Sequence, residues 1–378
     1  MSPWLVRRLL VVWVMFGGIF AVLGLFFWLQ IGITGRIQGF DFISFYATSQ
    51  VLLTAGPAHV YDLASEQRSQ FALLPGDQTY LPDLYPPYWV LARFWLALLP
   101  LRWAYLAWGV LTIAASAASL VILARTSGLD TWRSWPVLTA AGFVPLLANL
   151  LQGQSVAFVL LGIALSLWFQ SRGRELAAGV ALSTVLIKPQ LGFLLIGLLL
   201  LRPSVRALSG LGLAAAGMLT ASLAAFGIAG LTKWMSLLMQ DSGTAYRPWL
   251  SLRSVLLADG LIGWQQYLVL AALAAGLLAM VVLARLDLRR SVAVATAGSL
   301  LFAPHLNVHD LSVLVVPGLL LIGARQSRSL VAVAFFGGIV AIWFAPAAWL
   351  AELVLIWLAF HPSPASATSD AATRRFST

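Results

Sequence analysis

The sequence of 378 residues contains no cysteine, which excludes disulfide bonds, thiolate nucleophiles and cysteine-ligated metals. Charged residues make up only 10%, whereas soluble globular domains carry about 25%. The sequence also has no Walker loop, no GxGxxG motif after a strand and no GxSxG elbow. Hydrophobic residues instead reach 61%, so the composition indicates a membrane protein rather than a soluble enzyme.

Apolar stretches run through the whole chain and predict one membrane domain over residues 1–360. The first, from Leu9 to Leu29, is longer than a signal-peptide core and is interpreted as a retained helix. The pattern predicts an all-α, polytopic integral membrane protein with about twelve transmembrane helices. The candidate spans are 9–29, 103–124, 135–151, 154–171, 175–188, 189–202, 207–228, 264–285, 290–304, 309–324, 329–345 and 347–360.

The net charge of +10 is interpreted as membrane topology, not nucleic-acid binding, because the basic residues occupy short inter-helix loops. With Arg7 and Arg8 in the cytoplasm, most of the other arginines also fall inside. Both termini are then cytoplasmic, and residues 175–202 form a hairpin. The long segments 30–88 and 229–263 become external loops, and the tail 361–378 is predicted to be disordered.

The first external loop begins with Asp41 between two aromatic residues. Apolar residues after it approximate the spacing of a helix that lies in the membrane interface. Partial desolvation at this position would favour Asp41 as a general base, whereas a helix N-cap is the structural alternative. At the end of the loop, residues 88–100 are interpreted either as a half-helix or as a separate crossing.

Two polar groups on the same side of the membrane offer binding functions. Asn149, Gln152 and Gln154 lie between two spans, where amides either bind sugar hydroxyls or satisfy a tight turn. Lys188 and Gln190 mark the tip of the hairpin. A cation near the membrane favours a functional partner such as a lipid phosphate, and snorkelling to the interface is the alternative.

Two further groups lie later in the chain. Arg247 and Arg253 flank an aromatic segment suited to phosphate recognition, with a solvated loop as the alternative. His305 and His309, followed by Asp310, are consistent with phosphate contact, assistance to a leaving group, or a helix cap. A metal site is not favoured there because the spacing is less regular than in HExxH.

The order of these motifs resembles that of a known family. Asp41-Phe42 follows the first span, a stretch from Ala55 to Asp62 comes next, and Tyr85-Pro86-Pro87 enters a helix. Gln152-Gly153-Gln154, Lys188-Pro189-Gln190 and the histidine loop then follow in sequence. Over about residues 9–325 the chain resembles glycosyltransferase family 87, of the polyprenyl-phosphate-mannose-dependent alpha-1,2-mannosyltransferase type with the GT-C membrane fold.

The resemblance implies inverting transfer of a sugar from a polyprenyl phosphate to an acceptor hydroxyl, at the periplasmic face of a bacterial inner membrane. It implies that Asp41 and His309 are catalytic and that no cofactor is needed. Donor-phosphate contacts are expected from Lys188, Arg247, Arg253 and His305. Sugar or acceptor contacts are expected from Tyr46, Tyr85, Asn149, Gln152, Gln154, Gln190 and Asn307.

The chain is more compact than the mycobacterial mannosyltransferases of the family, and its second long loop carries few charges. The expected sugar is therefore mannose or another hexose or pentose, and the partners are the donor, a lipid or glycan acceptor and membrane lipid. A transporter or flippase of a lipid-linked sugar is the alternative from another class. It is disfavoured because the ionisable residues gather at one face rather than near the midplane.

Overall fold

The computed structural model describes residues 3–37, 40–74, 76, 80–130, 135–241, 250–261, 263–324, 328–341 and 346–361. Every regular element in these ranges is helical, which confirms the all-α class. The predicted disorder of the tail falls almost wholly outside the described residues.

Four helices of the described part are long and apolar enough to cross a membrane. They are α1 (Pro3–Thr34), α5 (Leu101–Thr126), α11 (Val205–Asp241) and α13 (Trp264–Leu283). Other apolar helices have 10–17 residues, below the roughly 17–25 of an ordinary span. The polytopic membrane fold is supported, and the count of about twelve spans stays a prediction.

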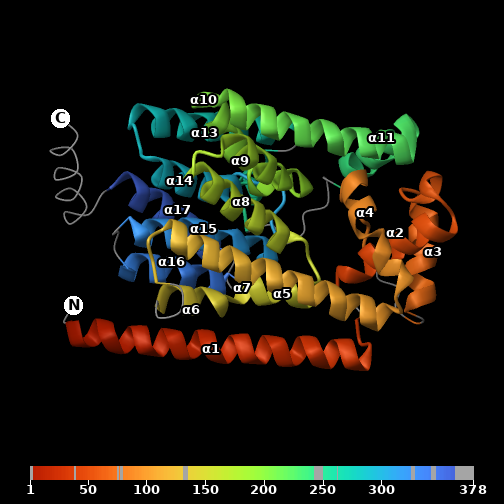
Figure 1. The fold of residues 1–378 in the computed structure, drawn as a ribbon, viewed down its shortest axis with the longest axis horizontal. Coiled ribbons are helices and arrows are strands. Elements are labelled where there is room, and N and C mark those ends of the chain that lie inside the picture. Colours follow the sequence, from red (N-terminus) through yellow and green to blue (C-terminus); the bar gives the residue numbers. More distant parts are fainter. Residues whose placement is uncertain are drawn as a thin grey trace.

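The shorter helices follow the predicted spans closely. They are α6 (Trp135–Ala141), α7 (Val144–Gln152), α8 (Val156–Gln170), α9 (Glu175–Leu182), α10 (Phe193–Leu201), α14 (Leu288–Leu301), α15 (Val315–Gly323), α16 (Arg328–Val340) and α17 (Pro346–Phe360). Helices α14 and α15 are almost entirely buried. In contrast, α1 lies along one side of the bundle, and many of its apolar side chains are exposed, as a lipid-facing helix requires (Figure 1).

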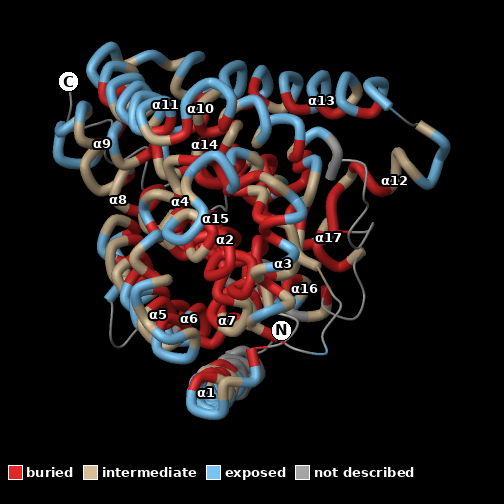
Figure 2. Tube along the Cα trace, turned by 90° about the vertical axis from the view of Figure 1, so that its right-hand side faces the viewer, coloured by how far each residue is buried: buried red, intermediate tan, exposed pale blue. Residues whose placement is uncertain are grey.

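The first external loop forms α2 (Phe42–Thr54), α3 (Leu63–Leu73) and α4 (Pro87–Arg93) at one end of the bundle (Figure 1). The helix expected after Asp41 is present, and its expected position in the membrane interface stays a prediction. Residues 42–49 are all buried, and α2 lies in the middle of this end (Figure 2). Its polar positions, Ser44, Thr48 and Ser49, face other parts of the protein because α3, α4 and α5 surround it.

Residues 88–100 do not cross the membrane. They form the end of α4 and a 3₁₀ segment, Phe94–Leu98, before Pro100 precedes α5. Twelve helical residues at about 1.5 Å each span far less than a bilayer of about 30 Å. The half-helix interpretation is therefore the correct one.

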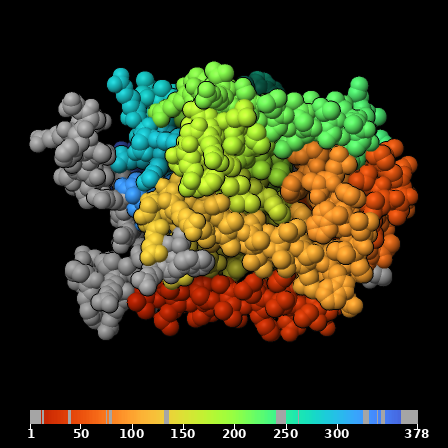
Figure 3. All heavy atoms as spheres, viewed as in Figure 1, coloured from red at the N-terminus to blue at the C-terminus, as the bar shows by residue number. Residues whose placement is uncertain are grey.

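The second segment predicted to be an external loop, residues 229–263, begins with helical residues. Helix α11 is interrupted by a kink at Gly227, whose φ of 63° and ψ of −177° are not helical, and a second helical part then runs to Asp241. Glycine adopts this positive φ without the steric penalty of other residues. The predicted end of the span at residue 228 therefore lies next to a real break, but residues 229–241 beyond it are helical. The extension packs on the first loop, where the Trp234 indole donates to the Leu84 carbonyl at 3.0 Å (Figure 3).

Helix α9 and the 3₁₀ segment Ser183–Ile187 lead to Lys188, and Pro189–Leu191 then leads into α10. Because α9 and α10 are each too short to span the bilayer, the backbone turns inside the protein, where it is shielded from lipid. The predicted hairpin thus places Lys188 at its tip.

Candidate active site

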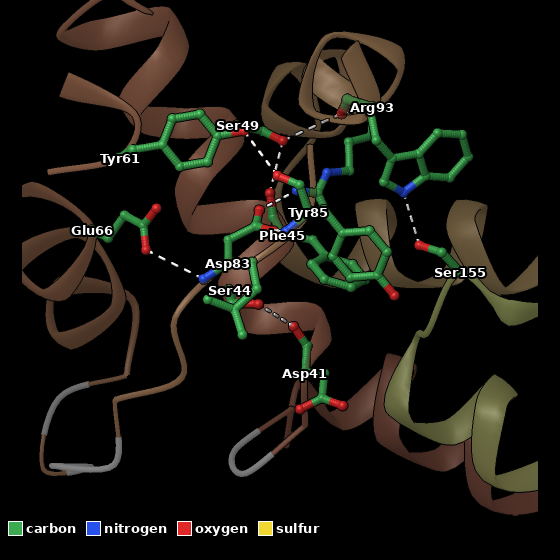
Figure 4. Close-up of polar contacts among 12 residues, drawn as sticks. Asp41, Ser44, Phe45, Ser49, Tyr61, Glu66, Asp83, Tyr85, Arg93 and Ser155 are labelled. Atoms are coloured by element: carbon green, nitrogen blue, oxygen red, sulfur yellow. Dashed lines mark hydrogen bonds and ion pairs between the residues drawn. The ribbon is translucent and has the colours of Figure 1, made fainter. Parts of the chain in front are cut away.

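Asp41 occupies the N-cap position of α2, but its side chain makes no capping hydrogen bond. Its carboxylate Oδ2 instead accepts from Gln154 Nε2 at 2.5 Å, and its backbone N–H donates to Gln152 Oε1 at 3.2 Å. Figure 4 shows the carboxylate pointing away from Ser44 and the first turn of α2. The N-cap interpretation is therefore wrong, and the acid group is directed at the turn between α7 and α8.

The turn between α7 and α8 is fixed from several sides. Gly153 has a φ of 67°, and a Cβ at this residue would lie 2.7 Å from Phe42 Cβ. Its carbonyl accepts from the Trp108 indole at 2.7 Å. The Trp89 indole donates to Ser155 Oγ at 2.9 Å (Figure 4). The close approach that a glycine permits brings Gln152 and Gln154 against the start of α2.

Tyr85 connects this turn to the rest of the site. Its hydroxyl donates to Gln154 Oε1 at 2.7 Å, while the same amide donates to Asp41. Lys188 Nζ lies 5.6 Å from the centre of the Tyr85 ring, within the range of a cation–π interaction. Tyr85 therefore lies between the carboxylate side and the cationic side of the site.

The cationic side is a buried cluster of Lys188, His309 and Asp310. Lys188 Nζ donates to Asp310 Oδ1 at 2.9 Å and lies 3.2 Å from His309 Nε2. Asp310 is fully buried, and its other oxygen accepts from the Asn307 N–H at 2.9 Å. Asn307 Nδ2 also lies 3.1 Å from His305 Nε2, so the histidine loop folds around this carboxylate.

Burial raises the pKa of Asp41 above its usual value. The hydrogen bond from Gln154 and the charges of Lys188 and His305 oppose this rise, and the charge of Asp310 adds to it. The two sides of the site meet at Tyr85, whose hydroxyl contacts Gln154 and whose ring contacts Lys188. The arrangement combines a carboxylate suited to accept a proton with a cation suited to a developing negative charge.

Several predicted residues have structural partners instead of facing Asp41. Asn149 Oδ1 accepts from the Val156 N–H at 3.1 Å, which satisfies the tight turn. The Tyr46 hydroxyl donates to the Leu99 carbonyl at 2.7 Å. Arg253 donates to Gln266 and to the Pro304 carbonyl, and so supports the histidine loop from behind.

The sequence predicts two further binding residues, Gln190 and Arg247. Gln190 is half-buried beside Lys188 in the hairpin tip. Arg247 lies outside the described residues. Among the residues that the structure describes, no group of three or more His, Cys, Asp or Glu side chains is arranged to hold a metal ion.

Asp310 was not singled out as a site residue. The signal that identifies it is physical: a lysine buried in a membrane protein requires an opposite charge, and few carboxylates exist in this chain. The neighbouring His309 indicates a functional loop in the sequence, but it does not predict that Asp310 pairs with Lys188.

The fold and the site define a helical membrane protein with a partly buried carboxylate near a buried lysine. The chain belongs to glycosyltransferase family 87, whose sequence model matches residues 84–306, more than half of its length. Tyr85, Gln154 and Lys188 lie inside the matched range, whereas Asp41 precedes it and His309 follows it. No curated protein and no solved structure matches the chain.

Proposed function

We propose that this membrane glycosyltransferase moves a sugar from a polyprenyl-phosphate donor to an acceptor hydroxyl, with inversion and with Asp41 as the general base. The observation that carries the proposal is the partly buried Asp41 carboxylate, held by Gln154 and connected through Tyr85 to the Lys188 cation. The sugar is mannose or another hexose or pentose, and the fold is of the GT-C type. Membership of a glycosyltransferase family favours this enzyme over the transporter alternative.

In the proposed reaction the acceptor oxygen attacks the anomeric carbon and gives its proton to Asp41. The bond between the anomeric carbon and the phosphate oxygen breaks on the opposite face, and the phosphate leaves with the bonding electrons. Lys188 stabilises the growing negative charge, so the phosphate needs no proton. His309 contacts the same phosphate, while His305 and Arg253 hold the loop that carries it.

Two amides are suited to bind sugar or acceptor hydroxyls beside the base. Gln152 and Gln154 both contact Asp41, so a hydroxyl bound by either amide would lie near the carboxylate. The polyprenyl chain requires an apolar path, which the exposed apolar side chains of the bundle supply. No metal or other cofactor takes part in the proposed steps.

The proposed location is the inner membrane of a bacterium, with the site in the periplasm and both termini in the cytoplasm. Exposed arginines occupy the helix connections opposite the Lys188 turn, namely Arg172 and Arg174 after α8, and Arg285 and Arg289 around the start of α14. The positive-inside rule places such loops in the cytoplasm, which puts Asp41 and Lys188 on the other side.

The test of the proposed function is sugar transfer by the purified chain in proteoliposomes. A panel of labelled polyprenyl-phosphate sugars serves as donor, and a membrane lipid extract serves as acceptor. We expect labelled product from one donor and none from the matching nucleotide sugar, because the donor is proposed to bind through its prenyl chain as well as its phosphate. Equal transfer from the nucleotide sugar, or none from any prenyl donor, would overturn the proposal.

The pH profile of the reaction provides a second prediction. A general base acts only in its deprotonated form, so transfer is expected to decline as the pH falls through the pKa of Asp41. Because burial raises this pKa, the decline should begin above the range of an ordinary aspartate, which titrates near 3.9. The measurement is kcat/KM against pH in proteoliposomes. A flat profile down to pH of about 4 would contradict the role of Asp41.

A further inference from the structure

Three ionisable side chains of the first loop, Glu66, Asp83 and Arg93, have no exposed surface. They belong to α3, to the segment before α4 and to the end of α4, and they meet behind Tyr85 (Figure 4). Burying an ion pair costs desolvation energy that its attraction often fails to repay. A pair of hydrophobic side chains would hold the loop equally well, so stability alone does not account for this cluster.

Arg93 is held by one ion pair and two aromatic rings. Its Nη2 donates to Asp83 Oδ2, and its guanidinium carbon lies 4.2 Å from the Phe45 ring centre and 5.2 Å from that of Tyr85. The other guanidinium nitrogens, Nε and Nη1, are buried and have no hydrogen-bond partner within the part of the chain that the structure describes. The planar cation is thus placed against the Tyr85 ring and fixed there by Asp83.

Asp83 holds the backbone of the same tyrosine. Its Oδ1 accepts from the Tyr85 N–H at 3.2 Å, and the Tyr61 hydroxyl donates to the Tyr85 carbonyl at 2.8 Å. Glu66 Oε2 in turn accepts from the Asp83 N–H at 3.4 Å and from the Tyr80 hydroxyl at 2.8 Å. Tyr85 is therefore constrained at its amide, its carbonyl and one face of its ring.

The remaining polar atom of Tyr85, its hydroxyl, determines how the Gln154 amide is oriented. It donates to Gln154 Oε1, which leaves Nε2 directed at the Asp41 carboxylate. The reverse orientation would bring the amide oxygen against a carboxylate oxygen, and two acceptors repel each other. The position of Tyr85 thus decides whether Asp41 has a hydrogen-bond donor.

We propose that Arg93 and Asp83 are positioning residues that hold Tyr85, and through Tyr85 and Gln154 the Asp41 carboxylate, for sugar transfer. The inference rests on the proposed function, because it assumes that Asp41 is the base. A positioning role differs from a purely structural role in one respect. Loss of the Asp83–Arg93 ion pair should change the pH at which Asp41 titrates, and not merely the amount of folded protein.

The test compares Tyr85→Phe with the double variant Asp83→Leu/Arg93→Met. The double variant removes both buried charges together, so that neither is left unpaired. Arg68→Met is the matched control, because Arg68 is an exposed arginine of the same loop whose side chain donates to Ser65 and contacts neither Tyr85 nor Gln154 among the described residues. Each protein is reconstituted in proteoliposomes and assayed with the prenyl donor that the wild type uses.

Two readouts are measured for each variant. The first is the acid limb of kcat/KM against pH. The second is the infrared band of the protonated Asp41 carboxyl, identified by its absence from Asp41→Asn, which titrates whether or not sugar is transferred. The other charged groups that face Asp41, namely Lys188, His305 and Asp310, are unchanged in all three variants.

We expect Tyr85→Phe to move both readouts to higher pH, because Gln154 no longer donates reliably to Asp41 and its hydrogen bond lowers the pKa of that group. The double variant should show the same direction, and combining it with Tyr85→Phe should add no further shift. Arg68→Met should behave as the wild type. A folded double variant with wild-type titration and kcat/KM would overturn the proposal. A wild type that transfers no sugar, with the infrared shift present in both variants, would overturn the proposed function and support the positioning contacts.

Discussion

Replacement of Asp41 by asparagine is expected to lower kcat by about 10²–10⁴-fold, the usual contribution of a general base. Asparagine has nearly the same shape, and its carbonyl oxygen retains an acceptor for Gln154 Nε2. The fold and donor binding should therefore persist while the proton acceptor is lost. The measurement is initial transfer rate and donor dissociation constant in the same proteoliposomes.

Asp62→Asn is the matched control for this prediction. Asp62 belongs to the same loop, where it accepts a hydrogen bond from Ser65 at the start of α3 and has no contact with Gln154 or Lys188 among the described residues. We expect it to keep wild-type transfer. Undiminished transfer by Asp41→Asn would remove Asp41 from the mechanism, and equal losses in both variants would point to damage of the loop.

The second large effect is expected at Lys188. Lys188→Met should lower kcat by about 10²–10³-fold, comparable with the removal of one group that stabilises a transition-state charge. The same change leaves Asp310 buried without its partner, which costs about 3–5 kcal/mol of stability. The single variant is therefore expected to lose both transfer rate and folding stability. A second variant is needed to distinguish these two effects.

The double variant Lys188→Met/Asp310→Asn separates the two effects because it leaves no unpaired buried charge. We expect the amount of folded protein and its melting temperature to return toward the wild-type values, while transfer stays as low as in the single variant. Thermal unfolding in detergent and single-turnover transfer provide the two measurements. Recovery of transfer in the double variant would mean that Lys188 serves only to neutralise Asp310.

Hydropathy is a local property, so continuous apolar runs of residues correctly predicted the four long helices that could cross a membrane. Charge placement also predicted correctly that residues 175–202 turn back at Lys188. It did not predict that residues 229–241 form a second helical part beyond Gly227, although the predicted end of the span at residue 228 lies next to that break. This second part packs on the first loop, where Trp234 contacts Leu84, and such a contact between distant segments has no local sequence signal.

Asp41 and Lys188 were predicted from an energetic anomaly, whereas the resemblance named Tyr85 and Gln154 as sugar or acceptor contacts without indicating that they connect Asp41 to Lys188. Asp41 between aromatics and Lys188 near the membrane are both unfavourable unless they have partners, and each was identified for that reason. Their partners Tyr85, Gln154 and Asp310 depend on contacts between distant segments. The burial of α2 and the contact of the Asp41 side chain with Gln154, in place of a capping hydrogen bond, depend on those same contacts.

The order of synthesis limits when this enzyme becomes active. Asp41 contacts a glutamine that follows 113 residues later, and Lys188 contacts a histidine a further 121 residues along the chain. The first loop is therefore synthesised long before the glutamine, lysine and histidine with which it shares the candidate site. The site is complete only when His309 and Asp310 have been made, so its chemistry is assembled last.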